Sequence, residues 1–92
     1  MWNEEKSRLL RGDLSRGGIG LEECAAAIEN GDVLANMPHP SNRYWHQWIY
    51  VLRINNYAYV VPYVGNAEEI FLKTFYPSRT YTKFFLEAMG NE

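Results

Sequence analysis

Two strand-forming runs that flank Asn55-Asn56 place the strongest constraint on how this 92-residue chain can fold. Residues 47–54 and 57–64 are rich in β-branched and aromatic side chains, which favour strands. Because asparagine tolerates positive φ, the pair predicts a two-residue turn that joins the runs into an antiparallel hairpin. Ile54 should then oppose Tyr57, and this pairing fixes the register of the residues further along both strands.

Side chains alternate between the two faces of a strand, so this register also predicts the composition of each face. The first face should pack under helices and carries Trp48, Tyr50, Leu52, Ile54, Tyr57, Tyr59, Val61, Tyr63, Ile70 and Leu72. The second face is half apolar and basic, and carries Gln47, Val51, Arg53, Ala58, Val60, Pro62, Phe71 and Lys73. We expect the second face to form a shallow groove.

The segments before the hairpin predict two helices and a short edge strand. Asn3 can cap a helix that Gly12 ends, and a second helix begins near Leu21 and stops at Gly31. The second helix has one apolar face, formed by Leu21, Cys24, Ala25 and Ile28. Residues 33–37 are predicted to form the edge strand, and residues 38–42 a loop.

Residues 70–86 predict a strand that ends at Pro77 and runs into a helix capped by Ser78. A hairpin at residues 65–68 should connect this strand to the meander, with Val64 opposing Glu69 and Val60 opposing Lys73. The apolar face of the last helix is expected to consist of Tyr81, Phe84, Phe85 and Ala88.

These elements predict one α+β domain over residues 1–92. Two N-terminal helices and a C-terminal helix should pack on one face of an antiparallel meander of three or four strands. No apolar run approaches the ~18–20 residues of a membrane-spanning helix. Acidic Glu4 and Glu5 stand where a signal peptide is basic, and Cys24 is the single cysteine, so we expect a cytoplasmic protein without a disulfide.

Charge is unevenly distributed along the chain, although the net charge is only −2. Residues 1–32 contain seven acidic and four basic residues, whereas residues 33–67 contain Arg43, Arg53 and no acid. Between residues 70 and 86 the only charges are Lys73, Arg79 and Lys83. Binding follows the local field rather than the total charge, so this distribution favours a polyanionic partner for the sheet region.

The chain resembles the BrnT-like toxins of bacterial type II toxin–antitoxin systems, which belong to the RelE/ParE toxin superfamily. The resemblance covers nearly the whole chain and depends on the order and spacing of short pieces. These pieces are Trp2-Asn3-Glu4-Glu5-Lys6, Gly20-Leu21-Glu22-Glu23, His39-Pro40, His46-Gln47, Asn56-Tyr57-Ala58-Tyr59-Val60-Val61-Pro62 and the segment from Lys73 to Lys83.

This resemblance implies a RelE/ParE-like arrangement and metal-independent cleavage of messenger RNA, with no cofactor. Messenger RNA on the ribosome is one substrate that it implies. It also implies a partner, a cognate antitoxin encoded beside the toxin as a small repressor. Neither a membrane nor a metal is expected to take part.

Such a reaction needs a base for the ribose 2′-OH, an acid for the leaving 5′-oxygen and cations near the phosphorus. Arg79 at the start of the last helix is the first candidate, because its planar fork binds two phosphate oxygens. Lys73 and Arg53 on the groove face are the next cations, and His46 can act as a proton carrier. Three further residues are predicted to bind RNA, the cation Lys83 and the aromatic residues Tyr76 and Tyr81.

Each candidate also has a purely structural interpretation. Arg79 can solvate a helix end, Lys73 can protect an edge strand from aggregation, and Arg53 can be ordinary surface. His46, between Trp45 and Trp48, can be a packed histidine. The alternative function is therefore a non-catalytic protein-interaction module of the same fold, which binds an antitoxin or poisons a protein target. A third alternative is a small domain with no nucleic-acid role.

Overall fold

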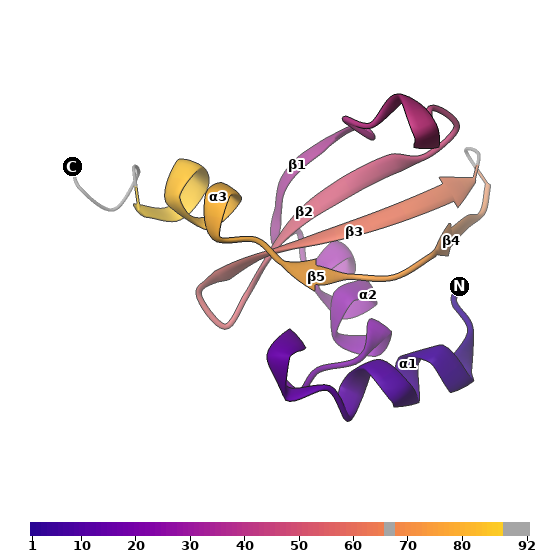
Figure 1. Ribbon diagram of the computed structural model, residues 1–92, viewed down its shortest axis with the longest axis horizontal. Helices are drawn as coiled ribbons and strands as arrows, with labels where there is room; N and C mark the ends of the chain where they lie inside the picture. The colour runs from indigo at the N-terminus through magenta and orange to yellow at the C-terminus, as the bar shows by residue number, and fades with distance from the viewer. Residues whose placement is uncertain (66–67, 88–92) are drawn as a thin grey trace.

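A computed structural model describes residues 1–65 and 68–87, and its elements form an α+β fold (Figure 1). The helices are α1 (Glu4–Arg11), α2 (Leu21–Glu29) and α3 (Arg79–Tyr81), which continues as the π-helical turn η3 (Thr82–Glu87). The strands are β1 (Val33–Pro38), β2 (Trp48–Ile54), β3 (Tyr57–Gly65), β4 (Ile70–Leu72) and β5 (Tyr76–Pro77). Two 3₁₀ turns are η1 (Leu14–Arg16) and η2 (Asn42–Tyr44). None of the helices described is long and apolar enough to span a membrane.

The strands form one antiparallel sheet in the order β1-β2-β3-β4, with β5 pairing to β3 beyond the end of β4. The predicted hairpin register is confirmed, since Ile54 opposes Tyr57 and Leu52 opposes Tyr59. The turn residue Asn55 has φ 53° and Asn56 has φ 61°, as a two-residue turn requires. The predicted edge strand is also present, as β1.

The predicted register between β3 and β4 is wrong by two residues. Tyr63 opposes Leu72 and Gly65 opposes Ile70, so Val64 faces Phe71 rather than Glu69. The reason is that β3 continues one residue further than predicted, to Gly65, where a Cβ would collide with the Glu69 carbonyl oxygen. Because the shift is even, Ile70 and Leu72 still lie on the predicted face.

The helices α1 and α2 pack on the face that was predicted to form the core, and lie together beneath the strands in Figure 1. Leu21 and Cys24 of α2 are fully buried against Leu52 and Val61 of the sheet. The predicted helix boundaries hold, because Asn3 accepts the Lys6 N–H and Gly31 has φ 80° just beyond α2.

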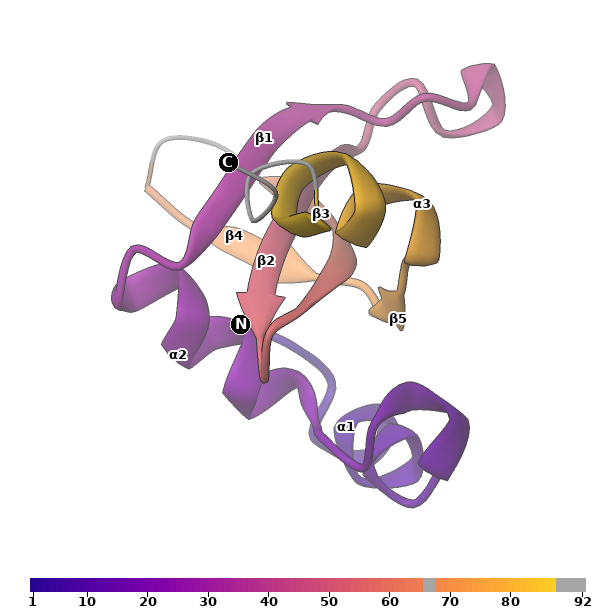
Figure 2. The same ribbon diagram turned by 90° about the vertical axis from the view of Figure 1, so that its left-hand side faces the viewer.

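The C-terminal helix packs on the opposite face, which corrects the prediction of three helices on one face. Tyr81 and Phe85 lie against the buried residues of this face, Ile49, Val51, Ala58 and Val60. In Figure 2 α3 lies well away from α1 and α2. The reason is that β5 leads directly over Ala58, whose carbonyl accepts the Ser78 N–H at 2.9 Å. Val60 is consequently 1% exposed rather than open to a partner.

The π-helical turn also changes which aromatic residue faces the sheet. Regular 3.6-residue spacing placed Phe84 beside Tyr81 and Phe85, but Phe84 is 68% exposed. A π-helix has more residues per turn than an α-helix, so it rotates the following side chains around the axis. Thr82 occupies the buried side instead, and the predicted contact of Ala88 falls outside the described residues.

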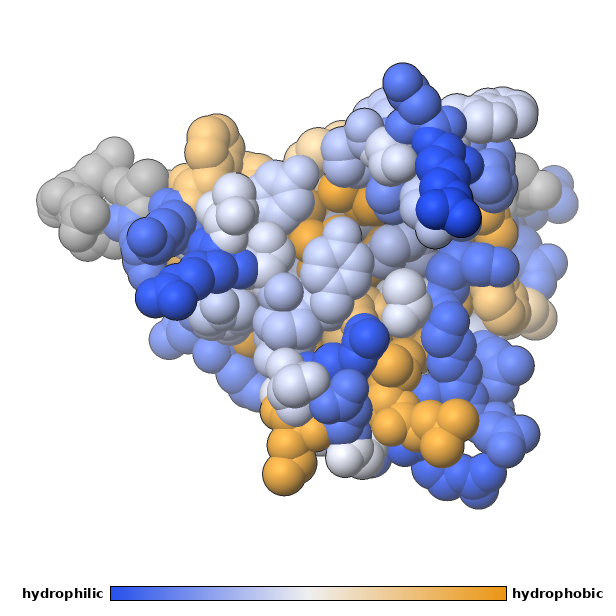
Figure 3. Space-filling view, viewed as in Figure 1, coloured by the Kyte–Doolittle hydropathy of each residue, from blue (hydrophilic) through white to orange (hydrophobic). Residues whose placement is uncertain are grey.

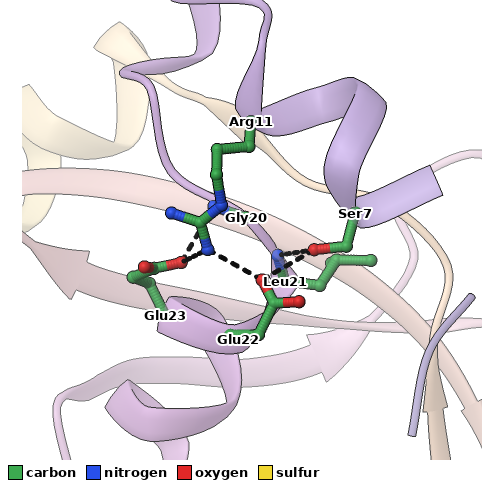
Figure 4. A network of polar contacts seen from close by, with 6 residues as sticks. All are labelled: Ser7, Arg11, Gly20, Leu21, Glu22 and Glu23. Carbon is green, nitrogen blue, oxygen red and sulfur yellow. Dashed lines mark hydrogen bonds and ion pairs between the residues drawn. The ribbon is translucent and has the colours of Figure 1, made fainter. Parts of the chain in front are cut away.

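A polar network joins the two N-terminal helices where α2 begins (Figure 4). Arg11 pairs with both Glu22 and Glu23, at 2.9 and 2.7 Å. Ser7, which is 1% exposed, accepts the Leu21 N–H and donates to Glu22. Gly20 is required at the centre, since a Cβ there would lie 2.7 Å from the Ser7 hydroxyl oxygen. The network satisfies the Gly20 and Leu21 N–H groups at the start of α2.

This network makes the stability of the fold pH-dependent. The Ser7 hydrogen bond lowers the pKa of Glu22, and the Arg11 side chain lowers the pKa of Glu23, from the ordinary value of 4.5. A depressed folded-state pKa gives stability that is present above the unfolded value and lost as pH falls below it. The free energy of unfolding, measured in urea from pH 6 to about pH 3, should fall as the pH falls. In Glu22→Gln this fall should be smaller than in the parent.

Glu29→Gln is the matched control, because Glu29 is exposed at the end of the same helix and forms no ion pair with residues 1–65 and 68–87. It should keep the parent's pH dependence. Identical slopes for the parent and Glu22→Gln would contradict the role given to the network.

The attachment of α3 to the sheet gives a second prediction. The Thr82 hydroxyl accepts the buried Ala58 N–H at 2.9 Å and donates to the Ser78 carbonyl at 2.7 Å. Thr82→Val keeps the shape but leaves the Ala58 N–H without a partner, so it should cost ~1–3 kcal/mol of unfolding free energy. Thr80→Val on exposed α3 surface should change it by less than about 0.5 kcal/mol. Equal stability of the two variants in urea would contradict this attachment.

Candidate functional site

The face that carries α3 remains open at its other end, where a cleft of about 350 Å³ lies between β5 and the loop after β1. We call it the basic cleft. Its lining residues are His39, Tyr44, Gln47, Pro62, Lys73, Thr74 and Tyr76. The predicted groove is therefore half correct: α3 and η3 cover its middle, and a cleft is found at this end.

An irregularity between β4 and β5 brings Lys73 and Tyr76 into the cleft together. Tyr63 opposes Leu72 and Val60 opposes Tyr76, so residues 72–76 lie against residues 60–63 of β3, which are one residue fewer. The extra residue reverses the alternation of side chains, as in a β-bulge. Tyr76 consequently faces the same side as Lys73, although the two residues are three positions apart. The sequence predicted one continuous strand here and missed this break.

Two contacts hold the bulge from the opposite face. Phe75 turns into the core, where it is fully buried, with its ring centroid 6.1 Å from that of Tyr59. The Arg16 guanidinium donates to the Phe75 carbonyl oxygen. Gly17 ends η1 at φ 83°, and a Cβ there would collide with the Tyr59 hydroxyl. Only glycine therefore lets η1 approach Tyr59 this closely.

The other wall of the cleft is the loop of residues 39–47, which its own hydrogen bonds keep ordered. The His39 N–H donates to the Gln47 carbonyl at 3.0 Å, and the Gln47 N–H donates to the Tyr44 carbonyl at 2.8 Å. Ser41 caps η2 through the Arg43 N–H. The loop therefore presents His39 and Tyr44 to the cleft on a defined backbone.

His39 is held in a definite tautomer. Its Nδ1 accepts the Ser41 N–H at 3.1 Å, so the neutral ring carries its proton on Nε2. The ring lies 5.0 Å from the Tyr44 ring, centroid to centroid. His39 can thus donate a hydrogen bond from its Nε2–H to a phosphate oxygen, whereas the sequence analysis gave the role of proton carrier to His46.

The charge of this face is positive. Lys73 is exposed, with its Nζ 5.6 Å from the centroid of the Phe71 ring. Arg79 and Lys83 are exposed on α3 and η3, and neither has an ion pair in the part of the chain that the structure describes. Figure 3 shows hydrophilic side chains at the α3 end and at the η2 and β4 end, on either side of a paler surface over β3 and β5.

Tyr76 and Tyr81 extend the cleft towards α3. Burial and then the neighbouring Tyr81 raise the pKa of Tyr76 above its ordinary value of 10.0. The Tyr76 phenol therefore stays protonated at neutral pH, as a hydrogen-bond donor that is 41% exposed. Tyr81 is half-buried and stacks on Phe85, with 5.8 Å between the ring centroids.

Two predicted site residues lie elsewhere. Arg53 was expected one pair beyond Lys73, but the register correction moves Lys73 next to Pro62, and Arg53 pairs with Asp32 at 3.5 Å. At ~3.3 Å per residue this separates them by about 13 Å along β2. His46 lies in a different cleft, on the helix-bearing face.

The sequence analysis placed Gln47 on the groove face but missed His39 and Tyr44. The signal that could have found them is composition, because residues 39–48 combine two histidines, an arginine and three aromatic residues without an acid.

Other reactive groups do not form a site in the described part of the chain. No cluster of three or more His, Cys, Asp or Glu side chains is arranged to hold a metal ion in residues 1–65 and 68–87. Burial raises the pKa of the Cys24 thiol to about 12, so this cysteine stays protonated and unreactive.

No sequence profile of a known protein family matches the chain, and comparisons with characterised proteins and with solved structures give no significant match. The site is therefore interpreted from its own chemistry. It combines a titratable imidazole, a lysine and a phenol in one cleft, with further cations and aromatic rings on both sides. This set suits a ligand that carries both phosphates and flat rings.

Proposed function

We propose that the protein is a metal-independent endoribonuclease, the toxin of a type II toxin–antitoxin pair, which cleaves messenger RNA in the basic cleft. The observation that carries the proposal is the meeting of His39, Lys73 and Tyr76 in that cleft, with no acidic residue among its described lining. The resemblance of the sequence to BrnT-like toxins of the RelE/ParE superfamily supports the same function.

In this mechanism the ribose 2′-OH attacks the adjacent phosphorus and the 5′-oxygen leaves. The 2′-OH proton passes to solvent water, and the His39 Nε2–H donates a hydrogen bond to a phosphate oxygen. Lys73 stabilises the charge that builds on the phosphate oxygens, and the protonated Tyr76 phenol donates a hydrogen bond or a proton to the leaving oxygen. Besides water, these roles need no group beyond the lining of the cleft.

Arg79 and Lys83 extend the binding surface. They lie beyond Tyr76 and Tyr81 on the α3 end of the same face, where a strand leaving the cleft would meet them. Phosphate contacts of this kind position a nucleic acid without reading its sequence. The aromatic rings of Tyr44 and Tyr76 can stack on unpaired bases, which favours single-stranded RNA.

The second candidate is a non-catalytic interaction module, and the exposure of Phe84 favours it. Phe84 is 68% exposed beside Lys83 on η3, an apolar and basic pair that suits an acidic, amphipathic antitoxin segment. A toxin would use the same surface to bind its antitoxin, so this candidate differs from the first only in lacking cleavage.

Removing single groups from the cleft should separate the two candidates. With purified protein and a single-stranded RNA, Lys73→Ala should slow cleavage by ~10²–10³-fold, as loss of one charge-stabilising donor does. His39→Gln should slow it by ~10²–10³-fold, because the hydrogen-bond donor at Nε2 is lost. Arg79→Ala should weaken RNA binding, and Arg79→Lys should recover only part of it.

Lys6→Ala is the matched control, because Lys6 is exposed on α1 away from the cleft, and it should cleave like the parent. Added chelator should leave the parent rate unchanged. If the parent binds RNA but never cleaves it, the nuclease mechanism is wrong. If Lys73→Ala and His39→Gln melt normally and cleave like the parent, the site assignment is wrong.

A further inference from the structure

A second cleft of about 450 Å³ lies on the helix-bearing face, where α1 and α2 do not cover the end of the sheet. We call it the aromatic cleft. Its lining residues are Asn36, His46, Trp48, Tyr50, Tyr63, Val64, Gly65 and Ile70. The neighbouring strands β1, β2 and β3 supply most of its floor.

The floor of the aromatic cleft is a platform of rings. Tyr50 and Tyr63 are stacked, with centroids 4.5 Å apart and planes 22° from parallel. Trp48 is the cross-strand partner of Tyr63 and is 46% exposed. Tyr63 is 9% exposed and belongs to the core, so the accessible rings of the cleft are Trp48 and the half-buried Tyr50. They offer stacking area to a flat ligand.

A polar group is fixed at one edge of this platform. The Tyr63 hydroxyl donates to Asn36 Oδ1 at 2.7 Å, which orients the amide. The amide nitrogen of Asn36 keeps its two N–H donors, for which the described residues supply no partner. Asn36 can therefore donate to an acceptor on the edge of a ring that lies on the platform.

The charge of the cleft indicates which part of a nucleotide it takes. Its described lining contains no lysine, arginine, aspartate or glutamate. A phosphate would lose its hydration there without gaining a cation, whereas a neutral aromatic ring is compatible with the site. A nucleobase has both the flat face and the edge acceptors that this arrangement fits.

The two clefts are connected through one short segment. Gln47 lines the basic cleft and Trp48, the next residue, lines the aromatic cleft, because side chains alternate in β2. His39 and His46 stand at the two ends of the same loop, one on each cleft. A single-stranded RNA that crosses the loop of residues 39–47 can therefore reach both clefts.

We propose that the aromatic cleft is a nucleobase subsite, which binds one unpaired base of the RNA whose backbone lies in the basic cleft. This inference rests on the proposed function. It makes residues 39–48 a ridge that the RNA straddles, and it assigns base preference to Asn36, Trp48 and Tyr63.

The test uses a fluorescein-labelled single-stranded RNA hexamer and a series in which one base at a time is replaced by an abasic residue. For the parent protein, one abasic position should lower affinity by roughly 5- to 100-fold, the size expected for loss of one stacked base. In Trp48→Leu that position should lose its penalty, while the salt dependence of binding stays unchanged. Lys73→Ala should instead reduce the salt slope by about one and keep the abasic penalty.

Leu9→Ala is the control, since Leu9 is 68% exposed on α1 and lines neither cleft, and it should keep the abasic penalty. Asn36→Ala is a second test if Trp48→Leu unfolds. It should reduce the difference in affinity between RNAs that carry different bases at the same position. An unchanged penalty in Trp48→Leu, or an unchanged base preference in Asn36→Ala, overturns the subsite while RNA binding through Lys73 stands. If the parent binds none of the hexamers, the proposed function itself fails.

Discussion

The bulge between β4 and β5 is the feature on which both sides of the molecule depend. It sends Phe75 into the core and Tyr76 to the opposite face, and a regular strand would exchange these two side chains. Buried Phe75 and the Arg16 hydrogen bond to its carbonyl hold this arrangement from the helix-bearing face. Arg16 of η1 thus helps to fix the position of Tyr76, although residues 1–32 supply none of the proposed RNA-binding residues.

Charge is also divided unevenly along the chain, since residues 1–32 contain seven acids and four bases, and residues 33–92 contain four acids and five bases. Two acids of α2 are used within the fold, where Arg11 and Ser7 hold Glu22 and Glu23 at the helix junction. The cations of the C-terminal half are mostly unpaired among the described residues, and Arg53, bound to Asp32, is the exception. A chain with net charge −2 can thus present a positive patch, because Lys73, Arg79 and Lys83 lie on the face opposite α1 and α2.

Sequence reasoning predicted the elements whose signals are local. The caps of α1 and α2, the Asn55-Asn56 turn and the β2–β3 register follow from single residues and their spacing. The errors come from tertiary effects: the Phe75 anchor breaks a strand that propensity favours, and the Thr82 bond to Ala58 draws α3 onto the far face. For the site, Lys73 and Tyr76 were found by charge and aromaticity. His39 was missed because only the folded loop brings it across from Lys73.

The central claim is that RNA binds across the ridge of residues 39–48 and away from α1 and α2. The most direct measurement is a titration of ¹⁵N-labelled protein with a single-stranded RNA, followed by amide chemical shifts. If RNA binds there, the changes in amide chemical shift should concentrate in residues 39–50 and 73–83 and stay small in α1 and around Glu22 and Glu23. Shifts centred on α1 and α2, or spread evenly over the surface, would contradict it.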